Sequence, residues 1–374
     1  MNSKKCQLCK IELNASNDSK EHILPNSVGG RKKVSGFICK SCNSKTGETW
    51  DAELASQLNW FSLFLGIVRE RGVPPSMVVN TSVGELNLHH DGTQSLIKPV
   101  YEVTESDGVA TLRIQARNER EVQQLIQRAK SQYPKLNIEE AMGKMQIVDD
   151  YTQRIVHTSF EFGGEKCGRS QVKSCMALAS TRGIDIEECV PADSYLNQGG
   201  PANFGYFFDS DLVLNRPADS IFHCVAVTGN TESKMLLGYV EYFSFQRVVV
   251  CLSDTYEGDS FEAVYAIDPR SGTELELKVE LFFSKEDIAA IYNYERSSED
   301  GMHSAMNEVM RIGYQASVKR QEDKAFDDAY SHALAECGYK ESDALTEEQA
   351  GKLSRLMAEK LTPYLLQRLN QNRN

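Results

Sequence analysis

The pattern of hydrophobic and polar positions changes along the chain and predicts an α+β protein. Residues 49–71 carry apolar side chains every three or four positions, which is typical of a helix that packs on a neighbour. The run Arg71–Pro75 (Arg-Gly-Val-Pro-Pro) ends this helix, because paired prolines favour extended backbone. We therefore expect a hinge near residue 75.

Short runs of alternating apolar and polar residues follow from residue 77 to residue 115. Turn signals such as His90-Asp91-Gly92 separate these runs. Asn118 has the position of a helix cap in front of an amphipathic run. The predicted elements are strands at 83–88, 95–103 and 110–115, a helix at 118–133, a strand within 145–165, a helix at 170–181 and a loop at 186–203.

The stretch from residue 204 to residue 283 is the most strand-like part of the chain. It is rich in Val, Tyr, Phe and Leu, and turns that contain glycine or proline punctuate it. An antiparallel sheet is the expected outcome. The predicted strands are 221–228, 234–243, 247–252, 263–267 and 274–283.

The chain is expected to be helical from residue 284 to its end. Ser284 with Asp287, and Thr346 with Gln349, have the spacing of capping boxes, and three or four helices fit in this length. The predicted domains are an N-terminal module (1–56), a helix and linker (57–76), an α+β body (77–283) and a helical C-terminal region (284–374).

Charge is unevenly distributed along the 374 residues. The net charge is −12, but residues 1–50 hold nine Lys and Arg against four Asp and Glu, so this segment carries about +5 and the remainder about −17. Such a chain is unsuited to coating nucleic acid by bulk electrostatics, whereas one small module could contact phosphates locally. Alternatively, these lysines are ordinary solvated charges.

The sequence offers no segment for a membrane. No stretch approaches the roughly 18 consecutive apolar residues of a membrane helix, and the first ten residues lack the apolar core of a signal peptide. We therefore expect a cytoplasmic protein. In that compartment ten cysteines favour reduced thiols or metal ligands over disulfides.

Four cysteines form two Cys-x-x-Cys pairs near the N-terminus. Cys6 pairs with Cys9, and Cys39 with Cys42. Four thiolates saturate a tetrahedral zinc ion, so this zinc would be structural and would fold a unit too small for a core of its own. The alternative is that these cysteines are buried without a metal.

Glu21 and His22 lie between the two pairs and are not needed by a filled zinc site. A histidine that titrates near neutral pH suits the deprotonation of water, and a carboxylate suits the binding of Mg²⁺. Adjacent residues of a regular strand point to opposite faces. The two side chains could therefore face one ion only with local twist or a bulge.

These residues together resemble a known family. The order Cys6-x2-Cys9, Glu21-His22-Ile23-Leu24-Pro25, Gly29-Gly30 and Cys39-x2-Cys42-Asn43 is similar to the zinc-bearing subgroup of HNH endonucleases. The resemblance covers residues 4–56 and implies a ββα-metal fold. It implies that His22 is the general base and that Glu21 and Asn43 hold a catalytic Mg²⁺ or Mn²⁺. Asp51 is either a further site residue or a surface charge of the following helix.

One position of the family pattern is missing. The family has an asparagine a few residues before the second cysteine pair, which orients the hairpin or the base, but here the region reads Lys33-Val34-Ser35-Gly36-Phe37. Ser35 could supply a hydrogen bond instead, or this subgroup could dispense with the role. The missing residue bears on activity rather than on the fold.

The resulting hypothesis is a metal-dependent endonuclease that hydrolyses DNA phosphodiester bonds. The body would select targets or sense a small-molecule or protein regulator, and by analogy the context is bacterial phage defence or restriction. A homodimer is expected, because a module that cuts one strand must pair to break a duplex. The alternative from another class is a non-catalytic zinc ribbon that binds nucleic acid or protein.

Overall fold

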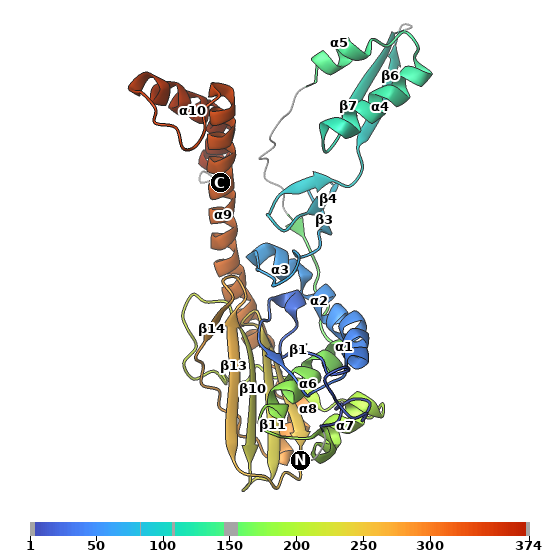
Figure 1. Cartoon of the computed structure of the whole chain (residues 1–374), viewed down its shortest axis with the longest axis vertical. Coiled ribbons are helices and arrows are strands. Elements are labelled where there is room, and N and C mark those ends of the chain that lie inside the picture. Colours follow the sequence, from blue (N-terminus) through green and yellow to red (C-terminus); the bar gives the residue numbers. More distant parts are fainter. Residues whose placement is uncertain (1–3, 83, 107–108, 146–155, 372–374) are drawn as a thin grey trace. The chain divides into compact units, whose positions relative to one another are not determined.

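The computed structural model describes residues 4–82, 84–106, 109–145 and 156–371. The chain forms two compact units, each made of two segments (Figure 1). The first unit comprises Met1–Pro75 and Phe160–Ser317, and the second comprises Ser76–Ser159 and Val318–Asn374. This grouping differs from the division by sequence, which placed residues 77–283 in one body. The reason is that the segment after residue 160 packs on the N-terminal module.

A six-stranded antiparallel sheet forms the centre of the first unit, as predicted. Its strand order is β14-β13-β10-β11-β12-β9. The strands are β9 (Phe204–Tyr206), β10 (His223–Asn230), β11 (Met235–Tyr242), β12 (Gln246–Ser253), β13 (Phe261–Asp268) and β14 (Thr273–Leu275). The predicted strand at 274–283 is wrong beyond Leu275, because the chain leaves the sheet there and rejoins extended structure only at a bridge between Val213 and Val279.

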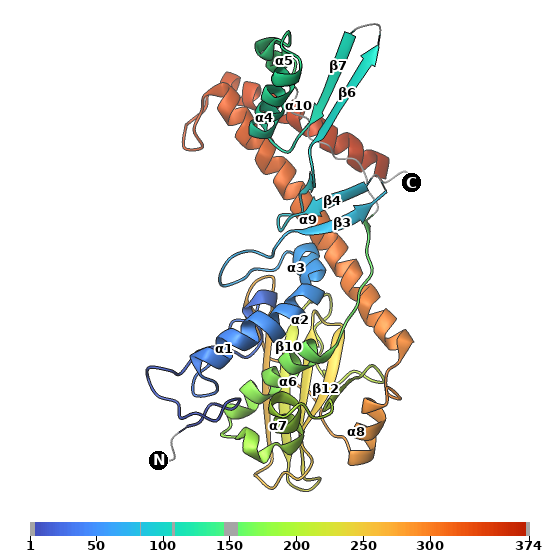
Figure 2. The ribbon, with the colours of Figure 1, turned by 90° about the vertical axis from the view of Figure 1, so that its right-hand side faces the viewer.

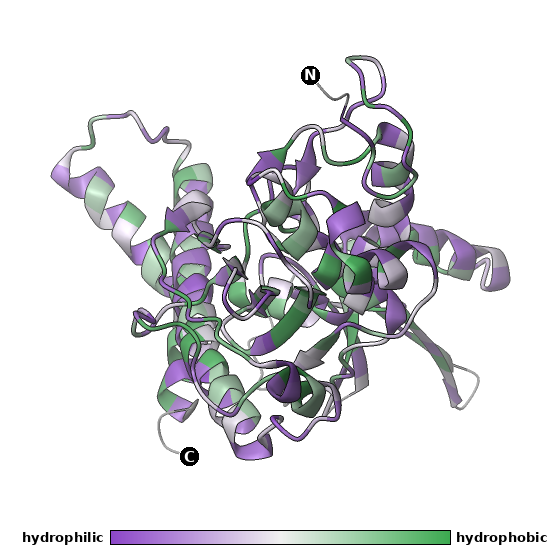
Figure 3. Ribbon diagram, turned by 90° about the horizontal axis from the view of Figure 1, so that it is seen from below, coloured by the Kyte–Doolittle hydropathy of each residue, from purple (hydrophilic) through white to green (hydrophobic). Residues whose placement is uncertain are grey.

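Both faces of this sheet are covered, and most residues of its central strands are buried. The helices, by contrast, carry both hydrophobic and hydrophilic positions (Figure 3). On one face, α6 (Glu165–Ser180) lies across β10, β11, β12 and β13, with α7 (Val190–Asn197) beside it (Figure 2). On the other face, apolar residues of segments 207–213 and 277–291 complete a core with the strands. The latter segment contains most of α8 (Lys285–Tyr292). This double burial explains why the central strands read as continuous apolar runs.

The loop predicted at 186–203 is wrong over most of its length. It contains the 3₁₀ turn η3 (Ile186–Glu188) and α7, which has a proline in its first turn. Proline is accepted there because that N–H needs no partner within the helix and the ring presets the helical φ.

The N-terminal module is a short hairpin followed by helices. Its elements are β1 (Glu21–His22), η1 (Asn26–Val28), β2 (Lys33–Val34), α1 (Lys40–Thr46), η2 (Gly47–Asp51), α2 (Ala52–Gln57) and α3 (Asn59–Leu65). In place of the single helix predicted at 49–71, the structure has a series of short helices that begins at Lys40 and ends at Leu65. The side chain of Cys39 caps α1, and Gly66 ends α3 in the left-handed conformation that glycine adopts readily.

The second unit contains small sheets and helices. Its elements are β3 (Met77–Thr81), β4 (Gly84–Leu88), β5 (Gln94–Leu96), β6 (Val100–Ser106), β7 (Val109–Gln115), α4 (Glu119–Gln132), α5 (Ile138–Gly143) and β8 (Val156–His157). Asn118 caps α4, as predicted. The strand predicted at 95–103 is split near Pro99, which has no N–H for a ladder. Of the strand predicted within 145–165, residues 146–155 lie outside the described part.

The C-terminal region is helical, as predicted. After α8, helix α9 (Glu299–Cys337) begins in the first unit and ends in the second, which also holds α10 (Glu347–Gln371). Ser284 and Asp287 form the predicted capping box, and Thr346 and Gln349 exchange the two corresponding hydrogen bonds. None of the helices in the described residues has the length and apolar character needed to cross a membrane.

Candidate functional site

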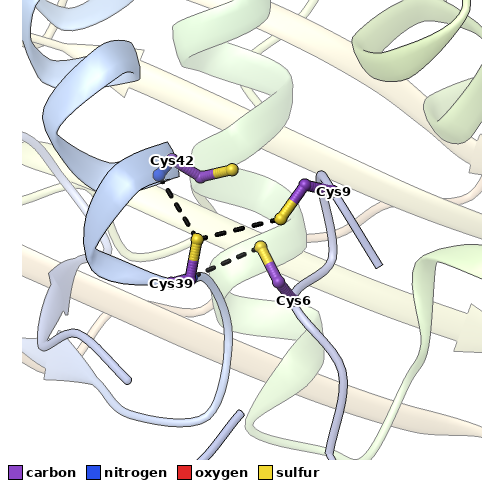
Figure 4. A group of neighbouring side chains, drawn as sticks. All are labelled: Cys6, Cys9, Cys39 and Cys42. Atoms are coloured by element: carbon purple, nitrogen blue, oxygen red, sulfur yellow. Dashed lines mark hydrogen bonds between the residues drawn. The ribbon is translucent and has the colours of Figure 1, made fainter. Parts of the chain in front are cut away.

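The four cysteines of the two pairs converge on one point (Figure 4). Their sulfur atoms all lie within 4.8 Å of one another, and the Cys9 and Cys39 sulfurs are 3.8 Å apart. Backbone N–H groups at the start of α1 donate to two of the sulfurs. The N–H of Cys39 reaches the sulfur of Cys6 at 3.3 Å, and that of Cys42 reaches the sulfur of Cys39 at 3.4 Å.

This cluster fits a structural zinc ion. Four sulfurs about 2.3 Å from a tetrahedral zinc are separated by about 3.8 Å, which is the distance found between Cys9 and Cys39. All four cysteines are free of disulfides, and N–H···S bonds favour the thiolate form that zinc requires. Four sulfur ligands leave no open position, so this zinc would hold the module together without taking part in chemistry.

Glu21 and His22 occupy a regular two-stranded hairpin. Glu21 is opposite Val34 and His22 is opposite Lys33, with no bulge between them. Their side chains therefore go to opposite sides, as strand geometry requires. Glu21 is buried, whereas 23% of the His22 side chain is exposed.

The buried Glu21 carboxylate binds a lysine from the other segment of the unit. Lys173 Nζ, on α6, lies 2.6 Å from Glu21 Oε1 and 2.6 Å from Asp51 Oδ2. The other oxygen of Asp51 accepts a 2.6 Å hydrogen bond from Ser170, also on α6. Asp51 is thus part of a buried ion cluster and not a surface charge. Removing one member of such a cluster typically costs about 3–5 kcal/mol.

The pKa values in this cluster reflect burial and mutual attraction. Burial alone would lower the pKa of Lys173, but the carboxylates of Asp51 and Glu21 reverse this effect and raise it. Burial raises the pKa of Glu21, which the Lys173 ammonium partly offsets. The lysine is therefore held as a cation.

His22 contacts a carboxylate on the other side of the hairpin. Its Nε2 lies 3.0 Å from Glu70 Oε2, and Lys33 Nζ lies 2.7 Å from the same oxygen. The N–H of Glu70 donates to Asn26 Oδ1 at 2.9 Å, which fixes the loop that carries the carboxylate. These contacts form a row from Asn26 through Glu70 to His22.

Electrostatics in this second cluster favour a neutral histidine. Burial lowers the pKa of His22 against the opposing effect of Glu70. Hydrogen bonds from Lys33 and His22 lower the pKa of Glu70 to about 2. Because an ionised carboxylate can only accept, the hydrogen of the neutral imidazole is on Nε2 and the lone pair is on Nδ1.

Asn43 lies on α1 and is half-buried. Its N–H donates to the carbonyl of Cys39, and its side chain makes no hydrogen bond to the residues that the structure describes. The structure thus joins Glu21 and Asp51 through Lys173, and it places His22 in a separate cluster with Glu70.

The Glu21 carboxylate does not fit the expected divalent ion in this arrangement. One of its oxygens binds a fully buried ammonium group. A divalent ion bound by Glu21 would lie close to the Lys173 ammonium. At about 4 Å and an effective dielectric constant near 20, two like unit charges repel by about 4 kcal/mol, and the double charge of the ion doubles this repulsion. Ligation of Mg²⁺ or Mn²⁺ by Glu21 and Asn43 stays a prediction from the family resemblance.

Most basic residues of the module have internal partners. Lys33 binds Glu70, Lys32 lies 3.6 Å from Glu274, and Lys40 donates to the carbonyl of Ser16. The Arg31 guanidinium donates to the carbonyl of Val68. These partners leave individual basic side chains at the edge of the hairpin, rather than a broad basic surface, to contact phosphates.

Sequence reasoning missed Lys173 and Glu70. Lys173 lies between Val172 and Ser174 on a helix whose neighbouring residues are all buried, so a charge in that run was the available signal. Glu70 falls at the end of the helix predicted at 49–71, where a glutamate is expected to be a surface charge. His223, on β10, is fully buried.

Comparison with known proteins identifies the module. Residues 6–59 match the family model of the HNH endonucleases. The matched segment holds the four-cysteine cluster, Glu21, His22 and Asn43, so the family resemblance is confirmed for this part of the chain. Comparisons with curated proteins and with solved structures gave no significant match. An HNH module supports a nuclease-type function and implies a nucleic-acid substrate.

Proposed function

We propose that the protein is an endonuclease that hydrolyses DNA phosphodiester bonds with His22 as the general base. The observation that carries this proposal is the partly exposed His22 imidazole, which is bound through Nε2 to Glu70. Its Nδ1 makes no hydrogen bond within the described residues, and burial keeps the ring neutral by lowering its pKa. A neutral imidazole with a free, oriented lone pair can accept a proton from water.

The steps follow from the placement of these groups. His22 Nδ1 accepts a proton from water as the water oxygen bonds to phosphorus, and the bond from phosphorus to the leaving oxygen breaks on the opposite side. The leaving oxygen takes a proton from solvent. Glu70 holds the imidazole and stabilises the imidazolium that forms, as a carboxylate behind a catalytic histidine does. Lys33, opposite His22 in the hairpin, binds the same Glu70 carboxylate and helps to hold it beside the imidazole.

Glu70 also offers a replacement for the asparagine that the family pattern has and this hairpin lacks. The family pattern uses an asparagine near Val34 and Ser35 to orient the hairpin or the base, and this hairpin has none. Here the Glu70 carboxylate, which comes from outside the hairpin, contacts His22. The Asn26 side chain accepts a hydrogen bond from the backbone N–H of Glu70 and so positions this residue. We assign the orienting role to Glu70.

The remaining parts of the function are also proposals. The module is a small part of the chain, so the rest is available for target selection or for sensing a small molecule or protein, as in phage-defence and restriction effectors. A cytoplasmic location and pairing of two copies through the C-terminal helices complete this proposal. Pairing would place two single-strand cuts close enough to break a duplex.

A plasmid-cleavage assay tests the proposal. Wild type, His22→Ala and His303→Ala are compared with Mg²⁺, with Mn²⁺ and without either ion, and zinc is measured on each protein. His303 is exposed on α9 and serves as the matched histidine control. We expect His22→Ala to lose cleavage while keeping zinc, and His303→Ala to cleave normally.

Equal cleavage by His22→Ala and wild type would overturn the mechanism. DNA binding without cleavage by the wild-type protein under all three conditions would instead favour the non-catalytic zinc ribbon. The internal partners of Lys32, Lys33 and Lys40 count against that alternative, because they reduce the free basic surface.

A further inference from the structure

A lysine from outside the nuclease module ends inside it. Lys173 lies on α6, more than 120 residues beyond Asp51 and 150 beyond Glu21, and only 1% of its side chain is exposed. Its Nζ donates to both carboxylates at 2.6 Å and lies 3.4 Å from Thr46 Oγ1. Charge-assisted hydrogen bonds of this kind are roughly twice as strong as neutral ones.

The helix that carries this lysine is wedged against the sheet. A methyl group added to Gly238 of β11 would lie 2.6 Å from the sulfur of Cys175, and one added to Gly168 would lie 2.3 Å from the ring of Phe204. Such close approaches leave no room for α6 to move along the sheet. The backbone that carries the lysine is therefore held in place beside the two carboxylates.

Both carboxylates of the cluster bind the same ammonium group. A buried lysine is a compact point charge, and here each of two carboxylates receives one of its three hydrogens. The same carboxylates would have to turn away from the lysine, or accept its repulsion, to hold a divalent ion. The family resemblance assigns that ion to Glu21, so the contacts of this chain disagree with the assignment.

We propose that Lys173 is a built-in cation that takes the place of a divalent metal ion at Glu21. Glu21 then anchors the hairpin to α6, and His22, as the next residue of the strand, is held at a defined position on the opposite side. The nuclease site would be composite, because one of its fixed charges comes from the segment that follows residue 160. This inference depends on the proposed function only in that it calls the site a nuclease site.

Manganese binding tests the inference without any cleavage assay. Zinc-loaded protein without DNA is titrated with Mn²⁺, and free Mn²⁺ is followed by its electron paramagnetic resonance signal. Wild type, Glu21→Gln, Lys173→Met and the Lys173→Met/Glu21→Gln double variant are compared. We expect wild type and Glu21→Gln to bind the same amount of Mn²⁺, and Lys173→Met to gain one equivalent that the double variant loses.

Two results would overturn the inference. One is a tight equivalent of Mn²⁺ in wild type that disappears in Glu21→Gln. The other is a folded, zinc-loaded Lys173→Met variant that gains no Mn²⁺ site. If Lys173→Met fails to fold, wild type against Glu21→Gln decides alone. Since no step of this test uses DNA, its outcome is separate from the failure or success of His22 as the base.

Discussion

His223 joins the central sheet to the N-terminal module, and its neutral state makes the fold sensitive to acid. The side chain is fully buried on β10. Its Nε2 donates to the carbonyl of Val28 at 2.7 Å, and its Nδ1 accepts from the N–H of Phe243 at 2.9 Å. Both ring nitrogens are thus used by the neutral form. Burial lowers the pKa of His223 to about 4, against an ordinary value of 6.5.

The sign of the effect follows from proton linkage. Between about pH 4 and pH 6.5 the unfolded chain binds a proton at this position and the folded chain does not, so stability falls as the pH falls. The full difference in pKa corresponds to about 3.4 kcal/mol. At pH 5 the loss relative to pH 7.5 is about 2 kcal/mol, which is a large part of a typical folding free energy.

Urea unfolding of wild type and His223→Gln at pH 7.5 and at pH 5 measures this contribution. Glutamine does not titrate, so the stability advantage of wild type over the variant should shrink by about 2 kcal/mol at the lower pH. Proton-dependent zinc binding is common to both proteins and cancels in the difference. His303→Gln, at an exposed position, should show no such change. An advantage that is the same at both pH values would refute the reasoning.

Three further predictions concern the zinc cluster, the orienting carboxylate and the core. Cys9→Ser should lose zinc and unfold the module, whereas Cys337→Ser should keep a full equivalent in a zinc assay. Glu70→Ala should lower kcat by up to about 10²-fold with little change in KM, whereas Glu70→Asp should recover part of the loss. Phe61→Ala should cost about 3–5 kcal/mol in urea unfolding, because Phe61 is fully buried 4.6 Å from the Phe245 ring. The 75% exposed Phe282 serves as the control for Phe61, and Phe282→Ala should change stability by less than about 0.5 kcal/mol.

The features that sequence predicts well here are local ones. The spacing of two cysteine pairs predicts the four-sulfur cluster, because one metal ion would join all four residues. The spacing of Ser284 and Asp287 predicts a helix start, because a capping box depends only on residues that are close in sequence. The antiparallel sheet is predictable for a related reason. Strands β10, β11 and β12 follow one another through short turns, as do β13 and β14, whereas the pairings of β13 with β10 and of β9 with β12 join strands that are not consecutive.

The partners of the site residues could not be predicted in this way. Glu21 meets Lys173 across 152 positions, and His22 meets Glu70 across 48. No periodicity links such residues, because the packing of α6 on the sheet and the course of the loop after Gly66 decide them. Strand alternation did indicate that Glu21 and His22 face opposite sides, and the structure shows what lies on each side.

Rates of plasmid cleavage by zinc-loaded wild type and His22→Ala test the central claim most directly. If His22 is the general base, the variant should cleave about 10² to 10⁴ times more slowly while its zinc content and far-ultraviolet circular dichroism match wild type. A rate within a few-fold of wild type, in a variant that keeps its zinc and its fold, would contradict the assignment of His22.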